Sequence, residues 1–355
     1  MGIKNLNHVI KKNLKNDIKK IYINNIASSI VGIDFSLFLY RFIYNKSNPI
    51  ECFLRQILMF FKHNILPVYV LDGKAPDEKK FIIEQRNYRK EKIIDEIHIL
   101  EMKLMSATNE YEKMQYQDNI NKLKKKYVVF SDNVISKITK FFDILGIPYI
   151  RNQNESDWLL SNLSKENIID YILSEDSDML AFGGKKILRN FSIREESFLL
   201  YDLDTILHEL EINHRQLVDI CILCGCDYIK KITGYNCTKS FSIIKKHKTI
   251  ENFIISNDED KNVEIDLAKI NNIRNIFLKK FEAEDIAQYH NTIVKKSTNY
   301  INLKTFLNNN LEISKKGLIT IFIDVCKNFI HYKSKKTSVL TNLWSKNITE
   351  DRTAK

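Results

Sequence analysis

Two short apolar runs that end in aspartate constrain the fold more than any other feature of the sequence. Ile30–Asp34 and Leu66–Asp72 are rich in Val, Ile and Leu, and each is closed by a carboxylate. Runs of this length and composition are typical of strands buried on both faces of a parallel sheet. Ile147–Ile150 and Ile168–Leu173 have the same character, and helical patterns fall between the four runs. We therefore predict an α/β fold with a mostly parallel central sheet flanked by helices.

Residues 79–126 lack strand patterns. Apolar residues recur there at helical spacing, as at Ile93, Ile97 and Leu100, and the pattern breaks at Ser106–Asn109. Two helical patterns separated by a short break predict a helical hairpin that is inserted into the α/β unit.

Six of seven candidate carboxylates stand where predicted strands end or where a helix begins, and the seventh, Asp227, lies in Gly225–Tyr228 before a pair of lysines. The seven are Asp34, Asp72, Glu155, Asp157, Asp176, Asp178 and Asp227. Taken singly, each has an ordinary explanation as a turn residue or as an acid in the first turn of a helix. The carboxyl ends of parallel strands share one edge of a sheet, however, so we expect these side chains to lie close together. Several like charges cannot share such an edge without neutralisation, and Mg²⁺ is a cation that prefers carboxylate oxygens.

The distribution of charge supports the same interpretation. The chain has a net charge of +11, but residues 131–231 carry 11 basic and 17 acidic side chains, whereas residues 232–355 carry 21 and 13. Basic flanks favour a polyanion, with nucleic acid the first expectation and an acidic membrane surface the second. An acidic centre repels a polyanion unless metal ions intervene. Two divalent ions would activate water and stabilise the leaving oxygen of a phosphodiester, which predicts a nuclease.

The order of several motifs resembles that of the flap endonuclease family of structure-specific 5′ nucleases. The motifs are Gly2–Leu6, Ile33–Asp34, Tyr69–Lys74, Glu155–Asp157, Glu175–Asp178 and Leu217–Tyr228, within about residues 1–250. The resemblance implies that the seven acids bind two Mg²⁺ ions, for which Mn²⁺ is expected to substitute. It also implies hydrolysis of flapped or branched double-stranded DNA near single-strand/duplex junctions, in replication, repair or recombination. The products would carry a 5′-phosphate and a 3′-hydroxyl.

The same resemblance divides the chain into functional parts. Residues 1–231 would form a PIN-like α/β nuclease core, with residues 79–126 as a helical arch that admits the 5′ strand. Residues 232–255 would form a helix–two-turn–helix motif that binds duplex DNA. Residues 256–355 would form a helical C-terminal extension, to which the sequence assigns no role.

Several residues outside the acidic set match DNA-contacting positions of the family. Lys79 and Arg86 match basic residues at the foot of the arch that orient the scissile phosphate. Lys79, Arg86 and Lys90 are spaced 7 and 4 residues apart and so form one stripe of a helix. Tyr40 matches an aromatic residue that stacks on a base near the cleavage site. Gly2 belongs to the amino-terminal motif and is also expected to lie near DNA.

The segment Ile232–Lys239 occupies the place of the helix–two-turn–helix turn. In the family, this turn binds duplex phosphates through backbone N–H groups and a K⁺ ion. Its usual Gly-Ile-Gly-Pro sequence is replaced here by Gly-Tyr-Asn-Cys, which departs from the pattern that holds K⁺. Asn236 tolerates the left-handed backbone better than most residues do, so we expect the turn to survive. The expected phosphate contacts are Gly234, Lys239, Lys245 and Lys246.

Departures from the family pattern leave alternatives open. The stretch between Asp34 and Asp72 is shorter than is usual in cellular flap endonucleases, where it supplies the wedge that splits the duplex and a pocket for a one-nucleotide 3′ flap. A 5′-3′ exonuclease or a Holliday-junction resolvase of the same superfamily is therefore the first alternative. A catalytically inert protein that binds branched DNA is the second, although such proteins usually lose some of the acids.

Other patterns bear on partners and location. No sliding-clamp motif and no phosphate-binding G-x-x-x-x-G-K-[ST] loop occur, so neither a clamp partner nor ATP is expected. Met1–Lys20 is polar and Lys-rich and no 18-residue apolar run occurs, which predicts an intracellular protein without membrane contact. We also expect a monomer that acts in the nucleus or in the host cytoplasm. The opening motif and the Lys-, Asn- and Ile-rich composition look closest to members from large DNA viruses. Four clustered cysteines are interpreted as free thiols rather than a zinc site, namely Cys221, Cys224, Cys226 and Cys237.

Overall fold

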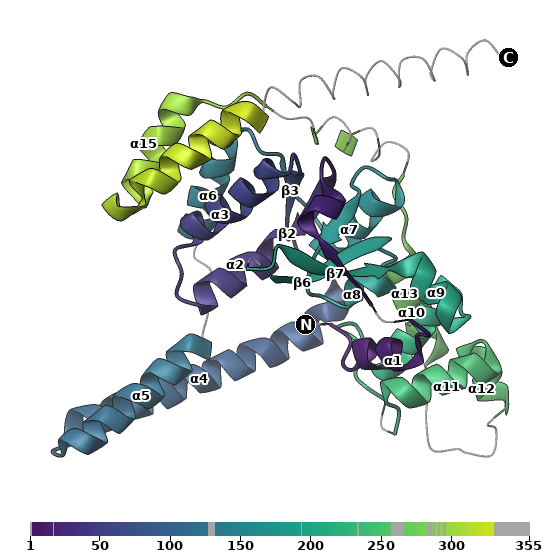
Figure 1. The fold of residues 1–355 in the computed structure, drawn as a ribbon. Helices are drawn as coiled ribbons and strands as arrows, with labels where there is room; N and C mark the ends of the chain where they lie inside the picture. The colour runs from purple at the N-terminus through teal and green to yellow at the C-terminus, as the bar shows by residue number, and fades with distance from the viewer. Residues whose placement is uncertain are drawn as a thin grey trace, which may run out of the picture.

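The structure is a computed structural model, and it places one sheet at the centre of the protein with helices on both faces (Figure 1). It describes residues 2–16, 18–126, 132–192, 194–232, 234–256, 266–282, 286, 288–289, 292–293 and 296–329. Within these residues, no helix combines the length and the apolar character that crossing a bilayer requires.

The sheet has seven strands in the order β1-β7-β6-β5-β2-β3-β4. The strands are β1 (Lys19–Tyr22), β2 (Ile30–Asp34), β3 (Leu66–Leu71), β4 (Tyr149–Arg151), β5 (Tyr171–Leu173), β6 (Lys186–Ser192) and β7 (Ser197–Asp202). Strands β6, β5, β2, β3 and β4 run parallel, whereas β7 and β1 extend the sheet in antiparallel fashion. The four predicted strands are β2 to β5, and the predicted α/β class with a mostly parallel sheet is confirmed.

Two layers of helices cover the sheet. One layer contains α2 (Phe35–Tyr44), α3 (Pro49–Lys62) and α6 (Asp132–Leu145), and Figure 1 shows α7 (Ser156–Lys165) and α8 (Asp178–Ala181) on the other side. Aromatic stacking fixes the first layer to β3, because the buried rings of Tyr69 and Phe142 lie 4.4 Å apart. The shorter elements near these layers are α1 (Leu6–Asn13), η1 (Ile23–Ile26) and α9 (Leu203–Leu210).

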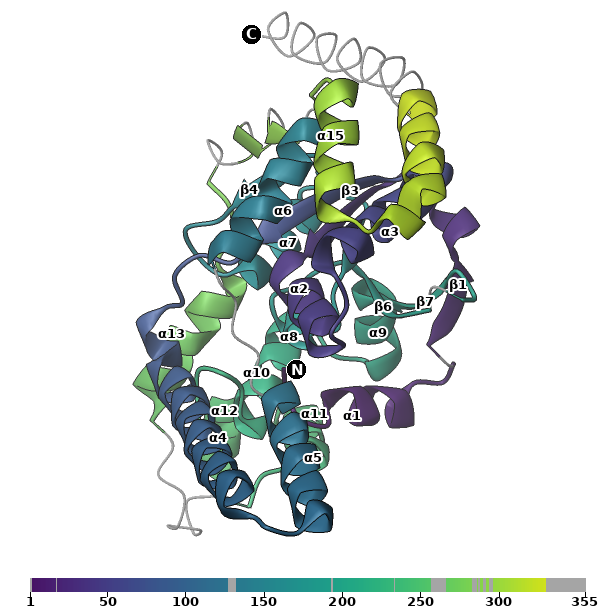
Figure 2. The same cartoon turned by 90° about the vertical axis from the view of Figure 1, so that its left-hand side faces the viewer.

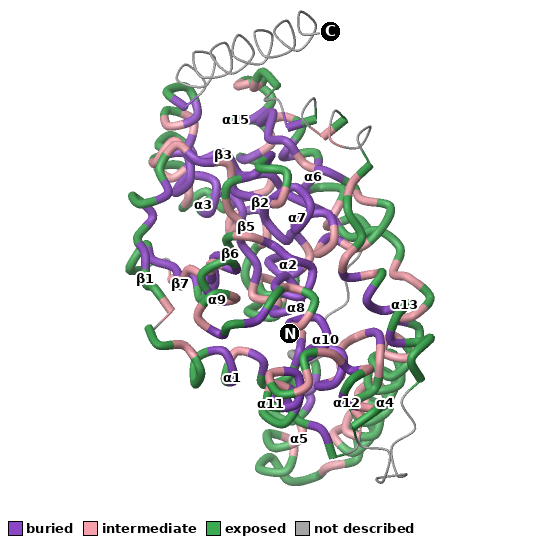
Figure 3. Tube along the Cα trace, turned by 90° about the vertical axis from the view of Figure 1, so that its right-hand side faces the viewer, coloured by how far each residue is buried: buried purple, intermediate pink, exposed green. Residues whose placement is uncertain are grey.

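A helical hairpin projects from this body. After η2 (Asp77–Lys79), α4 (Lys80–Ser106) and α5 (Glu110–Lys126) run side by side away from the sheet (Figures 1 and 2). Only a small cluster of Ile97, Ile120 and Leu123 is buried between them, and most of the hairpin is exposed (Figure 3). At about 1.5 Å per residue, α4 is long enough to reach about 40 Å from the core.

Below the sheet, α10 (His214–Cys224) packs with α11 (Cys237–His247), α12 (Ile250–Ser256) and α13 (Leu267–Leu278). A buried ion-pair network joins three of them. Arg274 on α13 donates to Asp219 on α10 (Nε to Oδ1, 2.6 Å) and to Glu251 on α12 (Nη1 to Oε1, 2.5 Å). The side chains of Arg274 and Asp219 are only 3% and 1% exposed. Because α10 leads directly into the loop that carries Asp227, this network fixes the origin of that loop.

The described part of the C-terminal region packs on the first helical layer. It contains α15 (Tyr300–Asn310), η3 (Ile313–Lys315) and a helix over residues 316–329. Phe329 stacks on Phe61 of α3 with ring centroids 3.8 Å apart, and Phe306 stacks on Phe141 of α6 at 5.8 Å. The division of the chain into three parts stays a prediction, and residues 330–355 of the predicted extension lie outside the described residues.

Removing Asp219 is expected to destabilise the protein strongly. Asp219→Ala leaves the buried guanidinium of Arg274 without one of its two carboxylate partners, and breaking a buried pair in this way costs about 3–5 kcal/mol of unfolding free energy. Urea unfolding followed by circular dichroism measures the change. The matched control is Glu195→Ala, which breaks the exposed Lys20–Glu195 pair and should leave stability unchanged. Equal effects of the two substitutions would contradict this assignment.

Candidate active site

The predicted acids are positioned by the carboxyl ends of neighbouring parallel strands. Asp34 is the last residue of β2 and caps α2, where its Oδ1 accepts a hydrogen bond from the Leu37 backbone N–H (3.2 Å). Its Oδ2 accepts from the Ser174 hydroxyl (3.1 Å) at the end of β5. Asp72 follows β3, and its Oδ1 accepts a hydrogen bond at 2.9 Å from the backbone N–H of Ser156, the first residue of α7. Both side chains are therefore held by the element that follows a strand.

The acids that follow β5 are held by the amino-terminal segment. Asp178 Oδ1 accepts from the backbone N–H of Ile3 (2.9 Å), and the Asp178 N–H donates to Asp176 Oδ1 (2.9 Å). Gly2, which has φ of +81°, packs so closely here that an added Cβ would lie 2.1 Å from Asp176 Oδ1. The structure thus places Gly2 against the acids, and its predicted contact with DNA stays a prediction.

Burial and mutual repulsion shift the protonation of these acids. Desolvation raises the pKa of Asp34 to about 7, and the charges of Asp72 and Asp176 contribute. Desolvation also raises the pKa of Asp157 and of Asp178, and the charge of Asp176 adds to both shifts. Five acids from different segments therefore act on one another electrostatically. Such a cluster is stabilised in its ionised form by hydrogen-bond donors and by positive charge.

Two basic side chains from the foot of the hairpin supply positive charge. The ammonium of Lys79 pairs with Glu155 and lies 3.5 Å from Asp227 Oδ2, and Arg86 Nη2 lies 2.9 Å from the same oxygen. Lys79 is only 7% exposed. Burial acts to lower the pKa of Lys79, but the carboxylates of Glu155 and Asp157 raise it above its usual range, so the side chain stays charged. The structure thus brings Lys79, Arg86 and the acids together.

Tyr228 contacts both members of the Lys79–Glu155 ion pair. Its hydroxyl donates to Glu155 Oε2 at 2.5 Å, and its ring lies under Lys79 with the ammonium 4.9 Å from the centroid. The tyrosine is buried, and its contact with Lys79 is a cation–π interaction. It therefore positions both members of the Lys79–Glu155 pair.

The donor set suits a hard divalent cation. All seven acids offer carboxylate oxygens, which are the ligands of Mg²⁺ and Mn²⁺. The raised pKa values of Asp34, Asp157 and Asp178 reflect desolvation and the charges of neighbouring acids. Across the residues that the structure describes, no three Asp, Glu, His or Cys side chains converge in an arrangement that would hold an ion as they stand. The ammonium of Lys79 lies between Glu155 and Asp227, so ion binding there requires it to move and the carboxylates to turn inward.

The remaining predicted DNA contacts lie on the surface around this site. Tyr40 on α2 is 36% exposed and stacks against Tyr44 (centroids 6.2 Å apart), and Lys90 is exposed on α4. Both side chains are accessible, and their roles stay predictions.

The predicted phosphate-binding residues near α11 are in different environments. Lys239 and Lys246 are exposed, whereas Lys245 is tied to Glu211 of α9 (Nζ to Oε2, 2.9 Å). Gly234 is exposed in a turn and has φ of +85°. The expectation of a left-handed Asn236 is wrong: its φ is −114°, and its side chain caps α11 by accepting from the Lys239 N–H. Gly234 supplies the positive φ, and Asn236 is needed as a helix cap.

Three contributors to the site were not predicted from the sequence. They are the Tyr228 hydroxyl, the Ser174 hydroxyl and the backbone N–H of Ile3. Tyr228 directly follows Asp227, so its place in the motif was the one available signal. The other two contribute through the three-dimensional approach of segments far apart in the sequence, which no local pattern encodes.

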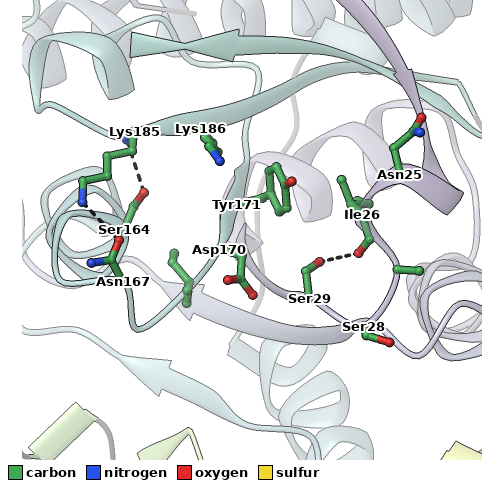
Figure 4. Close-up of a pocket in the computed structure, with 12 residues that line it drawn as sticks. Asn25, Ile26, Ser28, Ser29, Ser164, Asn167, Asp170, Tyr171, Lys185 and Lys186 are labelled. Carbon is green, nitrogen blue, oxygen red and sulfur yellow. Dashed lines mark hydrogen bonds between the residues drawn. The ribbon is translucent and has the colours of Figure 1, made fainter. Parts of the chain in front are cut away.

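A polar cavity at the opposite end of the sheet does not belong to this site (Figure 4). It lies where β2, β5 and β6 begin, and none of the predicted site residues lines it. Its polar groups bond to one another: Lys185 Nζ donates to Asn167 Oδ1 at 3.1 Å, and Asp170 Oδ2 accepts from the Ile30 N–H at 2.7 Å. The side chains of Lys185, Asn167 and Asp170 at this cavity therefore serve hydrogen bonds within the fold.

Comparison with solved structures identifies the same arrangement of elements. The catalytic core of Rad2 in complex with a DNA substrate superposes with a TM-score of 0.66 at 19% identity, over 91% of this chain and 99% of that one. Flap endonuclease-1 from Methanococcus jannaschii gives 0.62 at 18% identity, over 89% and 98%. Human GEN1 in complex with Holliday junction DNA gives 0.62 at 14% identity, over 92% and 78%. These similarities show the fold.

Sequence comparison defines the family. Residues 1–93 match the XPG N-terminal domain and residues 146–227 match the XPG I-region. The probable flap endonuclease 1 homolog of Danio rerio is 28% identical over 71% of this chain, and the match spans 65% of that protein, which is less than two thirds. Flap endonuclease 1 of Saccharomyces cerevisiae (strain ATCC 204508 / S288c) is 30% identical over 72% of this chain and 68% of its own length. The chain therefore belongs to the flap endonuclease family.

Proposed function

We propose that this protein is a divalent-metal-dependent, structure-specific 5′ nuclease that hydrolyses branched DNA near single-strand/duplex junctions. The observation that carries the proposal is the meeting of opposite charges at one edge of the sheet. Desolvated acids that raise one another's pKa lie in the same site as Glu155 and Asp227, which contact Lys79 and Arg86 from the foot of the hairpin. Acids of this kind can hold metal, and the cations beside them can bind a phosphate.

The residues of the chain have separable roles in this proposal. The seven acids would hold Mg²⁺ or Mn²⁺, which when bound supply an activated water and charge stabilisation at the leaving oxygen. Lys79 and Arg86 would leave the acids and donate to the scissile phosphate, where they stabilise developing negative charge. Tyr228 would keep Glu155 turned toward the ions. Tyr40 would stack on a base next to the junction.

Binding of the DNA duplex would rest on basic residues outside the acidic cluster. Lys239 and Lys246 are exposed near α11, where they can neutralise phosphates. In this proposal the protein acts as a monomer inside the cell and does not use ATP. Binding of K⁺ at residues 232–239 would be tested by measuring the affinity for duplex DNA in K⁺ and in Na⁺ at equal ionic strength. Higher affinity in K⁺ would support the site.

A second candidate activity is resolution of four-way junctions, or exonucleolytic cleavage from a 5′ end. The observation that favours it is the short connection between α2 and α3, which leaves only residues 45–48 between the helices. Four residues are too few to form both a separate wedge and a pocket for a 3′ nucleotide between these helices. The preferred DNA structure is therefore determined by comparing the rates at which the protein cleaves flap, nicked, gapped and four-way-junction DNA.

Cleavage should depend on metal and on the buried acids. With labelled 5′-flap, nicked, gapped and four-way-junction DNA, we expect cleavage in Mg²⁺ or Mn²⁺ and none in EDTA. Asp178→Asn should lower the single-turnover rate by about 10²-fold or more, because it removes the charge of a proposed metal ligand while leaving the volume of the side chain nearly unchanged. DNA binding should persist. The control Asp204→Asn, at an exposed first-turn position of α9, should retain full activity. Binding without metal-dependent cleavage would identify an inert junction-binding protein instead.

Lys79 should compete with metal in the absence of DNA. In Lys79→Met, the acids lose a charge that lies between Glu155 and Asp227, so Mg²⁺ binding to the DNA-free protein should tighten by about tenfold or more. Cleavage should nevertheless fall, because the phosphate contact is lost. Isothermal titration calorimetry and single-turnover kinetics measure the two effects. Lys90→Met, at an exposed position of α4, should leave Mg²⁺ affinity unchanged. Weaker Mg²⁺ binding in Lys79→Met would refute the competition.

A one-nucleotide 3′ flap should have little influence on the reaction. Because the α2–α3 connection is short, 5′-flap substrates with and without the extra 3′ nucleotide should be cut at rates within about threefold, and at several neighbouring positions. Gel mapping of the products measures both. A preference of more than about tenfold with a single cut position would show that a 3′-flap pocket is present elsewhere.

A further inference from the structure

Two buried cysteines face each other across the loop that carries Asp227. Cys224 is the last residue of α10 and Cys237 is the first residue of α11, and their sulfur atoms lie 2.6 Å apart. Both side chains are buried, at 6% and 3% exposure. Sulfurs at this separation need only a small shift to reach the disulfide distance of about 2.05 Å.

The surroundings favour a cysteine pair over a metal site. Cys224 and Cys237 are both thiols in the structure, and two other cysteines, Cys221 and Cys226, belong to the same part of the chain. Within the described residues, no three Cys, His, Asp or Glu side chains are arranged to hold a metal ion. The short sulfur–sulfur contact joins Cys224 to Cys237.

We propose that Cys224 and Cys237 form a reversible disulfide that closes the active-site loop between α10 and α11. Both helix ends are anchored, α10 by Asp219 in its pair with Arg274 and α11 by its Asn236 cap, so the two sulfurs are brought together by the fold. In intracellular proteins, disulfides of this kind are usually transient and redox-sensing.

The bond can form by exchange with a small-molecule disulfide such as oxidised glutathione. The Cys237 thiolate attacks one sulfur of that disulfide and releases one thiolate; the Cys224 thiol then loses its proton, attacks the mixed disulfide and releases the second. The protein loses two electrons and two protons, and the reagent becomes two thiols. Cys237 suits the first step because it lies at a helix N-terminus, and the hydrogen bond from Cys224 lowers its pKa.

The closed loop contains residues on which the proposed nuclease function rests. Asp227 pairs with Lys79 and Arg86, and Tyr228 donates to Glu155. Gly225 and Gly234 in the same loop have positive φ, so the open chain has unusual conformational freedom that a cross-link would remove. Oxidation is therefore expected to rigidify the loop that presents Asp227.

The test uses the full chain, incubated or refolded with oxidised and reduced glutathione and then alkylated without reduction. Peptide mapping by mass spectrometry should find Cys224 joined to Cys237 with the loss of two hydrogens. The oxidised protein should melt about 5 °C or more above the reduced protein, and amide exchange over residues 225–236 should slow. These readouts do not require nuclease activity, so they remain informative if the proposed function fails.

Matched variants separate this pair from other thiols. Cys224→Ala and Cys237→Ala should each abolish the cross-link and the redox-dependent melting shift, whereas Cys52→Ser on α3 and Cys226→Ser in the loop should keep both. Full alkylation of Cys224 and Cys237 in the wild-type protein after native oxidation and after oxidative refolding would overturn the proposal. A dominant link to Cys221 or Cys226 would overturn it as well.

Discussion

Repulsion among buried carboxylates is the constraint around which this structure is organised. Desolvation raises the pKa of Asp34, Asp157 and Asp178, and the charges of neighbouring acids raise it further. Such a cluster destabilises the fold unless backbone N–H groups, hydroxyls and cations compensate it. The Ile3 N–H and the Ser174 hydroxyl provide the first two kinds of partner, and Lys79 provides the third. Stability and function therefore depend on the same charges.

The topology explains why the acids come together at all. Strands β5, β2, β3 and β4 are parallel neighbours, so the segments that leave them share one edge, and each begins a helix or a turn. Asp34 and Asp72 are fixed there by helix-starting N–H groups. The other end of the sheet holds a cavity whose polar groups satisfy one another (Figure 4). The two ends of one sheet thus differ in charge because the clustered acids Asp34 and Asp72 lie at the carboxyl ends of the parallel strands.

The sequence predicts the central strands and the acids because both depend on local patterns. Continuous apolar runs identify β2 and β3, and Asp34 and Asp72 close or follow these runs. Strands β1 and β6 have no such run: β6 carries Lys186 and Arg189 among its apolar residues, and β1 has only Ile21 buried. Both pair with β7 in antiparallel fashion, and the fold supplies that partner. Asn236 was misjudged for a similar reason, since its capping role depends on where α11 begins.

Lys79 links the acidic cluster to the hairpin, because it is the residue that caps α4 and also the one that pairs with Glu155. Metal ions, the ammonium of Lys79 and a DNA phosphate therefore share a small set of partners. In the proposed function, metal that displaces Lys79 from the acids would free it for phosphate, and phosphate that engages Lys79 would free the acids for metal. Each ligand would then favour the other by the same free energy, as linkage requires. Metal and substrate would both act, through this one side chain, on the residue at the start of α4.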